Sequence, residues 1–143
     1  MTGNTKDPIG ASPLIAANPR VLLVEDDPLL ARALVRTLRA HSVEVTHVVG
    51  AADLSQRLGL YDVGIFDIDL PDVNGVELAE LCVAQKWVGH VVFFSATENE
   101  LRIRAAQSVG ELIHKSDGVE LLVGHVLWAC RRPSGVYGKP ALA

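Results

Sequence analysis

Short apolar runs alternate along the chain with longer segments in which apolar residues recur at helical spacing. The apolar runs predict five strands, at residues 21–24, 43–48, 63–66, 91–94 and 112–114. The other segments predict five helices, one that begins at Pro28 and four at residues 51–58, 75–85, 98–108 and 118–131. Because strands that alternate with helices form a parallel sheet covered on both faces, we predict a doubly wound α/β fold with a five-stranded parallel sheet.

The helical segments also indicate which side of each helix faces the sheet. Asp27 is placed to cap the first helix, with Pro28 at its first position. Apolar spacing predicts three buried faces: Leu30, Leu34 and Leu38 in the first helix, Leu78, Leu81 and Cys82 in the third, and Leu101, Ala105 and Val109 in the fourth. The last helix is apolar around most of its circumference, which suggests that part of it forms an interface.

Composition and charge exclude several classes of function. The 143 residues, 49% of them hydrophobic, fit one soluble globular domain. The net charge of -4 argues against a nucleic-acid surface, and no apolar run approaches the about 20 residues of a membrane span. Residues 1–19 lack the features of a signal peptide and are expected to be a flexible leader. Cys82 and Cys130 show no metal-binding spacing, so we expect reduced thiols and a cytoplasmic location.

Carboxylates directly follow two of the predicted strands. The segment FDIDLPDVNG, residues 66–75, runs from the third strand into Asp67 and Asp69, and Glu25 and Asp26 follow the first strand. If these strands are neighbours, Glu25, Asp26 and Asp67 meet at the carboxyl edge of the sheet, where ligands bind in such folds. Three carboxylates this close repel one another unless a cation joins them. Oxygen donors suit Mg²⁺, so we predict a magnesium site there.

A hydroxyl group and an ammonium group follow two further strands. Ser95 comes after the fourth strand and Lys115 after the fifth. Opposite a metal and carboxylates, these groups would bind an anion, most simply a phosphoryl group. The pattern therefore indicates a carboxylate nucleophile beside a metal ion and a positive charge.

With these motifs, the chain resembles the receiver domains of bacterial two-component response regulators over about residues 20–131. The matching motifs are Glu25-Asp26 after VLLV, Asp67 in DIDLPDVNG, Ser95-Ala96 after VVFF, and Lys115 after LIH. The resemblance implies a CheY-like, flavodoxin-like fold with strand order 2-1-3-4-5. It also implies a signalling domain that catalyses only its own phosphorylation and dephosphorylation.

The resemblance implies specific roles for the acidic residues. Asp67 would be the phosphoacceptor. Asp26 and Asp67 would hold Mg²⁺ together with the backbone carbonyl of Asp69, and Glu25 would act through bound water. The side chain of Asp69, two positions after the phosphoacceptor, could tune how fast water attacks the acyl phosphate.

The resemblance implies roles for Lys115 and Ser95, and the chain also departs from the family pattern at several positions. Lys115 would pair with one phosphoryl oxygen, and Ser95 would bond another and swing inward. Ser116 replaces the usual proline, Leu112 replaces an aromatic residue common in relatives, and the loop before the fifth strand is short. A switch that flips a tyrosine is therefore not expected. Thr97 is expected to affect phosphoryl lifetime.

Other polar and aromatic residues are expected to be structural. We interpret Asp72 as a solvated turn residue. The five histidines show no metal-ligand spacing and are expected to be structural or exposed. Trp87 and Trp128 are expected to pack rather than to bind a ligand.

The C-terminal residues bear on the output of the domain. The segment RRPSGVYGKPALA resembles the linker of the NarL/FixJ class, in which a LuxR-type helix-turn-helix follows. We expect a leader at residues 1–19, a receiver at 20–131, and a tail or linker at 132–143. Expected partners are a histidine kinase or phosphotransfer protein and a second copy of the chain, bound through the last helix or through the surface of the fourth helix, fifth strand and last helix. Contacts of this chain with nucleic acid or membrane are not expected.

Three alternatives remain open. The chain could be a stand-alone receiver, or a pseudo-receiver that docks without being phosphorylated. The D-x-D of Asp67 and Asp69 also occurs in haloacid-dehalogenase-type phosphohydrolases, where the first Asp is a phosphorylated nucleophile. In those enzymes the motif follows the first core strand, whereas here it follows the third, which disfavours this alternative.

Overall fold

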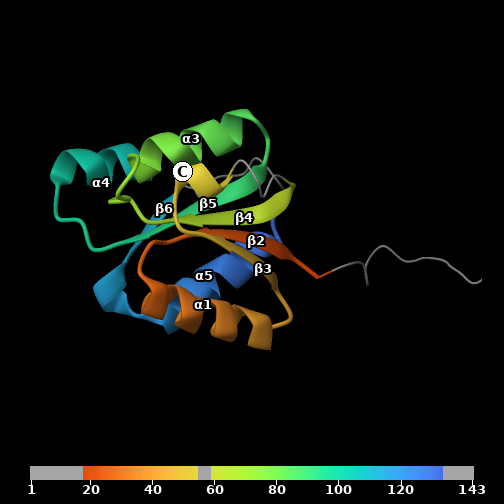
Figure 1. Ribbon diagram of the computed structural model, residues 1–143. Coiled ribbons are helices and arrows are strands. Elements are labelled where there is room, and N and C mark those ends of the chain that lie inside the picture. Colours follow the sequence, from red (N-terminus) through yellow and green to blue (C-terminus); the bar gives the residue numbers. More distant parts are fainter. Residues whose placement is uncertain (1–17, 55–58, 134–143) are drawn as a thin grey trace, which may run out of the picture.

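A five-stranded parallel sheet lies at the centre of the fold (Figure 1). The computed structural model of the protein describes residues 18–54 and 59–133. The strands are β2 (Arg20–Val24), β3 (Glu44–Val48), β4 (Tyr61–Phe66), β5 (Val88–Ser95) and β6 (Glu111–His114). They lie in the order β3-β2-β4-β5-β6, which is 2-1-3-4-5 when counted along the chain. The predicted sheet and its order are confirmed.

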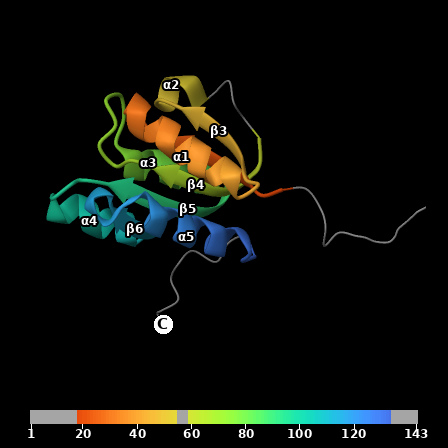
Figure 2. The ribbon, with the colours of Figure 1, turned by 90° about the horizontal axis from the view of Figure 1, so that it is seen from below.

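Helices cover both faces of this sheet. Those that pack on one face are α1 (Pro28–Ala40) and α5 (Val119–Cys130). The other face carries α2 (Ala51–Leu54), α3 (Gly75–Ala84) and α4 (Glu100–Gln107). Figure 1 shows the sheet between these two layers, and Figure 2 shows the molecule from below, from the side of α1 and α5. A short 3-10 turn, η2 (Lys115–Asp117), connects β6 to α5.

The strands are apolar along their length because helices bury both of their faces. Every residue of β5 is buried. Along this strand Val92 and Phe94 pack with α1 and α5, whereas Val91 and Phe93 pack on the opposite face. This explains why the central strands appear in the sequence as continuous apolar runs rather than as alternating patterns.

Side-chain caps fix where the helices begin. Asp27 Oδ1 accepts hydrogen bonds from the backbone N–H groups of Leu29 (3.0 Å) and Leu30 (3.3 Å), as predicted for the cap of α1. Asn74 caps α3 and Asn99 caps α4 in the same way. Each of these caps stands shortly after a strand end, so it orients the loop in which the polar residues lie.

The predicted buried faces of α3 and α4 are partly wrong. Leu81 is 46% exposed, and the residues that α3 buries with Leu78 and Cys82 include Ala79. In α4, Leu101 is 77% exposed, and Ala106 is the buried residue. Because each residue turns the helix by about 100°, an error of one position in register exposes the wrong stripe.

Two cysteines lie in or beside the core as free thiols. Cys82 on α3 is fully buried, and Cys130 at the end of α5 is partly buried. Burial raises the pKa of both thiols to about 11. Most of the expected leader, residues 55–58 of the second predicted helix, and the tail from 134 lie outside the described residues. Within the described ranges, no helix is both long and apolar enough to cross a bilayer.

Candidate functional site

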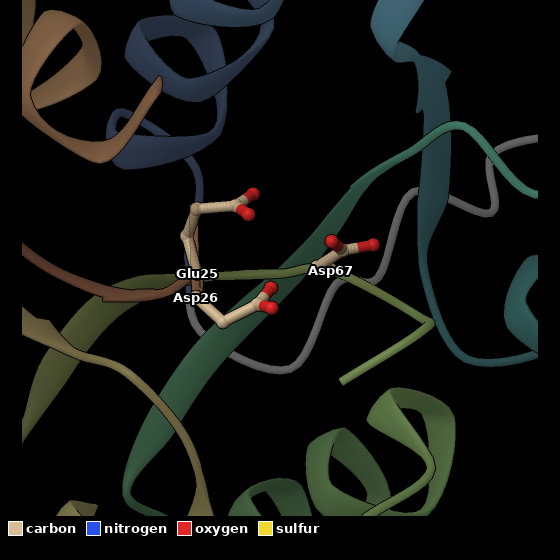
Figure 3. A group of neighbouring side chains, drawn as sticks. All are labelled: Glu25, Asp26 and Asp67. Carbon is tan, nitrogen blue, oxygen red and sulfur yellow. The ribbon is translucent and has the colours of Figure 1, made fainter. Parts of the chain in front are cut away.

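Three carboxylates meet at the carboxyl edge of the sheet. Glu25 and Asp67 are the residues that follow β2 and β4, and these strands pair directly, with Val24 opposite Phe66. The backbone N–H of Asp67 continues this pairing by donating to Val24 O at 3.1 Å. Oxygen atoms of Glu25, Asp26 and Asp67 lie within 4.8 Å of one another, and Figure 3 shows the three side chains around one space. The predicted juxtaposition of these three acids is therefore present.

The acids differ in their exposure to water. Glu25 is 1% exposed and Asp67 is 6% exposed, whereas Asp26 lies at the surface. Burial raises the pKa of Glu25; the Asp27 N–H that its carboxylate accepts at 3.1 Å opposes this rise, and the negative charge of Asp67 adds to it. The buried position of Glu25 beside Asp67 therefore disfavours its ionised form.

Lys115 is the cation that faces this cluster. Its Nζ atom lies 2.9 Å from Asp67 Oδ2 and 3.2 Å from Glu25 Oε1. Burial by itself would lower the pKa of Lys115, but the hydrogen bond and charge of Asp67, together with Glu25, raise it. Lys115 is thus held in its charged form beside the carboxylate that the sequence singled out.

Ser95 and Thr97 are buried at the end of the neighbouring strand. Ser95 is the last residue of β5, and its Oγ accepts a hydrogen bond from the backbone N–H of Thr97 at 3.3 Å. The hydroxyl of Thr97 in turn accepts from the N–H of Asn99 at 3.3 Å. These bonds hold both hydroxyl groups at the start of the loop that leads into α4.

Asp69 connects the acidic loop to α4. Its backbone N–H donates to Asp67 Oδ1 at 3.3 Å, while its carboxylate forms an ion pair with Arg102 in the first turn of α4. Nothing in the sequence pattern singled out Arg102. Its partner lies 33 positions away, and only the folded loop shows that the two side chains meet.

Asp72 is an exposed residue of the turn after β4, as predicted, and it also makes a contact that the sequence pattern does not indicate. Its side chain is exposed, but Oδ2 accepts a hydrogen bond from the backbone N–H of Ala52 in α2 at 3.3 Å. The contact occurs because the loop after β4 lies beside the start of α2. Asp69 and Asp72 therefore attach the loop of Asp67 to two different helices.

A glycine is required where this loop enters α3. A Cβ atom on Gly75 would lie 1.9 Å from the backbone oxygen of Asp67, far inside contact distance. The N–H of Gly75 donates to Ile68 O at 2.8 Å, which folds the loop back on the strand end. Gly75 thus permits the close approach that fixes the backbone of Asp67.

Comparison with known proteins agrees with this geometry. The sequence profile of the response regulator receiver domain matches residues 21–123, well over half of the chain. The chain belongs to the response regulator receiver domain family. It is the receiver domain of a two-component response regulator and, as such, a signalling domain rather than a metabolic enzyme. Receiver domains of these systems interact with histidine kinases or phosphotransfer proteins.

Several relatives are longer proteins that share this domain. The transcriptional regulatory protein CutR of Streptomyces coelicolor is 36% identical over 80 residues, which are 54% of this chain and 37% of CutR. The aerobic respiration control protein ArcA of Escherichia coli is 32% identical over 85 residues, 58% of this chain and 35% of ArcA. The sensor protein TorS of Escherichia coli is 31% identical over 109 residues, 72% of this chain and 12% of TorS. The matched region is thus a minor part of each relative.

Solved receiver structures share the fold. A CheY-like receiver domain protein from Methanospirillum hungatei has a TM-score of 0.72 and 21% identity, with 80% of this chain and 94% of that chain covered. The response regulator TrrA of Thermotoga maritima, in complex with Mg²⁺-BeF, has a TM-score of 0.67 and 22% identity, with 78% and 98% covered. At these identities the similarity establishes the fold of the receiver domain.

The residues present fit a magnesium ion. Receiver domains bind Mg²⁺ at an acidic pocket, and the cluster of Glu25, Asp26 and Asp67 offers only carboxylate oxygens. Mg²⁺ prefers such hard oxygen ligands and retains several waters. The exposed Asp26 leaves one side of the cluster open to water.

Neutralising Glu25 is expected to stabilise the metal-free protein. Because the pKa of Glu25 is raised on folding, its ionisation costs stability as the pH rises through the unfolded and then the folded pKa. In metal-free buffer at pH 7, Glu25→Gln should therefore raise the melting temperature by roughly 3 °C, the shift for about 1 kcal/mol in a domain of this size. The gain should shrink as the pH is lowered to about 3, where the wild-type carboxyl group is almost fully protonated in both states.

Thermal unfolding followed by circular dichroism at both pH values measures this effect. Glu80→Gln, at an exposed acid of α3, is the matched control and should change little. A gain of equal size at both pH values would show that charge on Glu25 is not the cause.

Proposed function

We propose that this domain accepts a phosphoryl group on Asp67 from the phosphohistidine of a histidine kinase or phosphotransfer protein. The observation that carries the proposal is Lys115 Nζ at 2.9 Å from Asp67 Oδ2, beside the cluster of Glu25, Asp26 and Asp67. A buried carboxylate between a cation and a divalent-metal site is the arrangement that nucleophilic attack on a phosphoryl group needs.

The transfer exchanges one bond to phosphorus for another. An Oδ atom of Asp67 forms the new P–O bond in line with the P–N bond that breaks. The histidine nitrogen of the donor leaves with the electron pair and takes a proton from solvent. Later attack by water on the phosphorus of the acyl phosphate breaks its bond to Asp67 and releases inorganic phosphate, which returns Asp67 to its carboxylate and resets the domain.

The neighbouring groups have distinct roles in this proposal. Carboxylates of Asp26 and Asp67 and the carbonyl of Asp69 would hold Mg²⁺, with Glu25 acting through water. When bound, the ion would neutralise the carboxylates and hold a phosphoryl oxygen. Lys115, already in contact with Asp67, would pair with another phosphoryl oxygen.

The signal would leave the site through Ser95 and Lys115. Ser95 stands one strand away from Asp67, and an inward move of its hydroxyl would carry the β5–α4 loop with it. That shift would change the surface formed by α4, β6 and α5. Leu112 on β6 is partly buried and packs against the core. It stands where the resemblance leads us to expect an aromatic residue, so we propose a switch that does not involve the flip of a tyrosine.

The proposal includes an output beyond the receiver, whose bounds we place at residues 20–131. The segment from 132 onward resembles the linker of the NarL/FixJ class, so a LuxR-type helix-turn-helix is the proposed output. CutR is named as a transcriptional regulatory protein, which supports a transcriptional output.

The proposal also includes a homodimer formed through α5. On this helix, Leu121 and Trp128 are 45% and 46% exposed, which supports such an interface. Sedimentation of the chain with and without a phosphoryl analogue measures that association.

Phosphoryl uptake from a small donor tests the proposal. We expect intact mass spectrometry to show one added phosphoryl group after incubation with acetyl phosphate and Mg²⁺, and none when Mg²⁺ is removed with a chelator. No adduct in either case would favour a pseudo-receiver that only docks. Steady release of phosphate from added phosphomonoesters would instead indicate a phosphohydrolase.

A further inference from the structure

His114 joins the two residues proposed to bind the phosphoryl group. It is the last residue of β6, directly before Lys115, and it lies opposite Ser95 in the register between β6 and β5. Its ring contacts Ser116 on one side and Glu98 on the other. A histidine at a strand end is unremarkable by itself, but these contacts connect it to both loops of the site.

The hydrogen bonds of His114 determine which ring nitrogen carries the proton. Its Nδ1 atom lies 3.1 Å from the backbone nitrogen of Ser116, which can only donate, so Nδ1 must be an acceptor. The Ser116 hydroxyl, 2.7 Å from the same atom, then donates as well. In the neutral ring the hydrogen is on Nε2, which donates to Glu98 Oε2 at 3.2 Å. All the ring contacts are satisfied by one tautomer.

This arrangement makes His114 the N-terminal cap of the turn that carries Lys115. The 3-10 turn η2 begins at Lys115, and the N–H of Gly118 closes it by donating to Lys115 O at 3.2 Å. At the start of the turn, the N–H of Ser116 donates to His114 Nδ1, so the side chain of the residue before the turn satisfies one of its N–H groups. The backbone from which Lys115 reaches Asp67 is therefore fixed at both ends of the turn.

The second contact of His114 reaches the loop that follows Ser95. Glu98 stands between Thr97 and Asn99, the residues whose backbone and hydroxyl bonds hold that loop. The Glu98 side chain is 86% exposed, so its bond to His114 is worth little in water. We therefore attribute the main effect to the cap on Ser116.

We propose that His114 is a positioning residue for Lys115: by capping η2 through Nδ1, it holds the ammonium group where the phosphoryl oxygen will arrive. This role rests on the proposed phosphorylation of Asp67.

Two substitutions at His114 separate the cap from the ring. His114→Phe keeps the ring volume and removes both nitrogens, whereas His114→Asn places a good capping oxygen near the position of Nδ1. We expect phosphoryl uptake from acetyl phosphate, and binding of beryllofluoride, to weaken about fivefold in His114→Phe, the factor for a cap worth about 1 kcal/mol. The His114→Asn variant should recover most of this loss.

Magnesium affinity distinguishes loss of the cap from general damage to the site. General damage would weaken Mg²⁺ binding, whereas loss of the cap alone would not. Lys115 faces the phosphoryl position, and His114 contacts none of the three clustered carboxylates in the bonds that the structure shows. The Kd for Mg²⁺, measured by calorimetry without a phosphoryl donor, should therefore be unchanged in both variants. Amide exchange at Ser116 should be faster in His114→Phe alone.

Each contrary result overturns the proposal in an identifiable way. If the wild type takes up the phosphoryl group and His114→Phe takes it up equally well, the cap does not position Lys115. Equal losses in His114→Phe and His114→Asn, or a parallel loss of Mg²⁺ affinity, would assign the effect to general damage. No uptake by the wild type would overturn the proposed function itself, and with it the role of His114.

Discussion

Replacing Asp67 with asparagine is expected to abolish phosphoryl uptake and to leave the fold intact. The amide has nearly the shape of the carboxylate but lacks the anionic oxygen that would bond to phosphorus. It also removes one of the three clustered carboxylates, so repulsion with Glu25 falls rather than rises. We expect uptake to fall by at least about a thousandfold, the scale of loss when a nucleophile is removed.

The neighbouring carboxylate provides a matched control. Asp69→Asn makes the same chemical change two positions away, on a side chain that pairs with Arg102 and is about half exposed. Its backbone N–H and carbonyl remain, so uptake should persist. Intact mass after incubation with acetyl phosphate and Mg²⁺ compares the variants, and circular dichroism checks that both are folded. An adduct as abundant in Asp67→Asn as in the wild type would place the phosphoryl group on another residue.

Replacing Gly75 with alanine is expected to destabilise the domain strongly. The added Cβ would lie 1.9 Å from the Asp67 backbone oxygen and 2.8 Å from the Ile68 Cα, and both neighbours are backbone atoms that cannot rotate away. The loop must therefore separate from the start of α3, which breaks the bond from Gly75 N–H to Ile68 O. We expect a loss of more than about 3 kcal/mol in the free energy of unfolding, at the severe end of single substitutions.

The same substitution elsewhere in the chain should have the opposite effect. A Cβ on Gly124 in α5 meets no atom within 4 Å, so Gly124→Ala should stabilise the helix by up to about 1 kcal/mol. Urea unfolding of the two variants and the wild type measures both changes. Similar small effects at the two glycines would mean that the loop after β4 is far more adaptable than its contacts indicate.

The strands and the acidic cluster could be predicted because each depends on local sequence. Strands buried on both faces are continuous apolar runs, and the residues that follow them must lie at one edge of a parallel sheet. Glu25, Asp67 and Lys115 could thus be brought together before any coordinates were known. The buried stripe of α4 could not, because a short helix at the side of a sheet has few apolar residues to define its register.

The contacts that link loops to helices were not visible in the sequence. Arg102 meets Asp69, and Ala52 meets Asp72, only because the loop after β4 folds between α2 and α4. His114 is one position from Lys115, yet its role depends on a turn that no pattern of apolar residues predicts. Such side-chain bonds depend on the exact course of loops, which periodicity does not describe.

The buried thiol of Cys82 has a practical consequence for following this domain. With a pKa of about 11, only about one Cys82 thiol in ten thousand is ionised at pH 7, and the fully buried sulfur is closed to reagents. Alkylation of Cys82 must therefore wait until α3 separates from the sheet. Since α3 begins at Gly75, beside Asp67, the rate at which Cys82 is alkylated measures how often the helix that borders the acidic site opens.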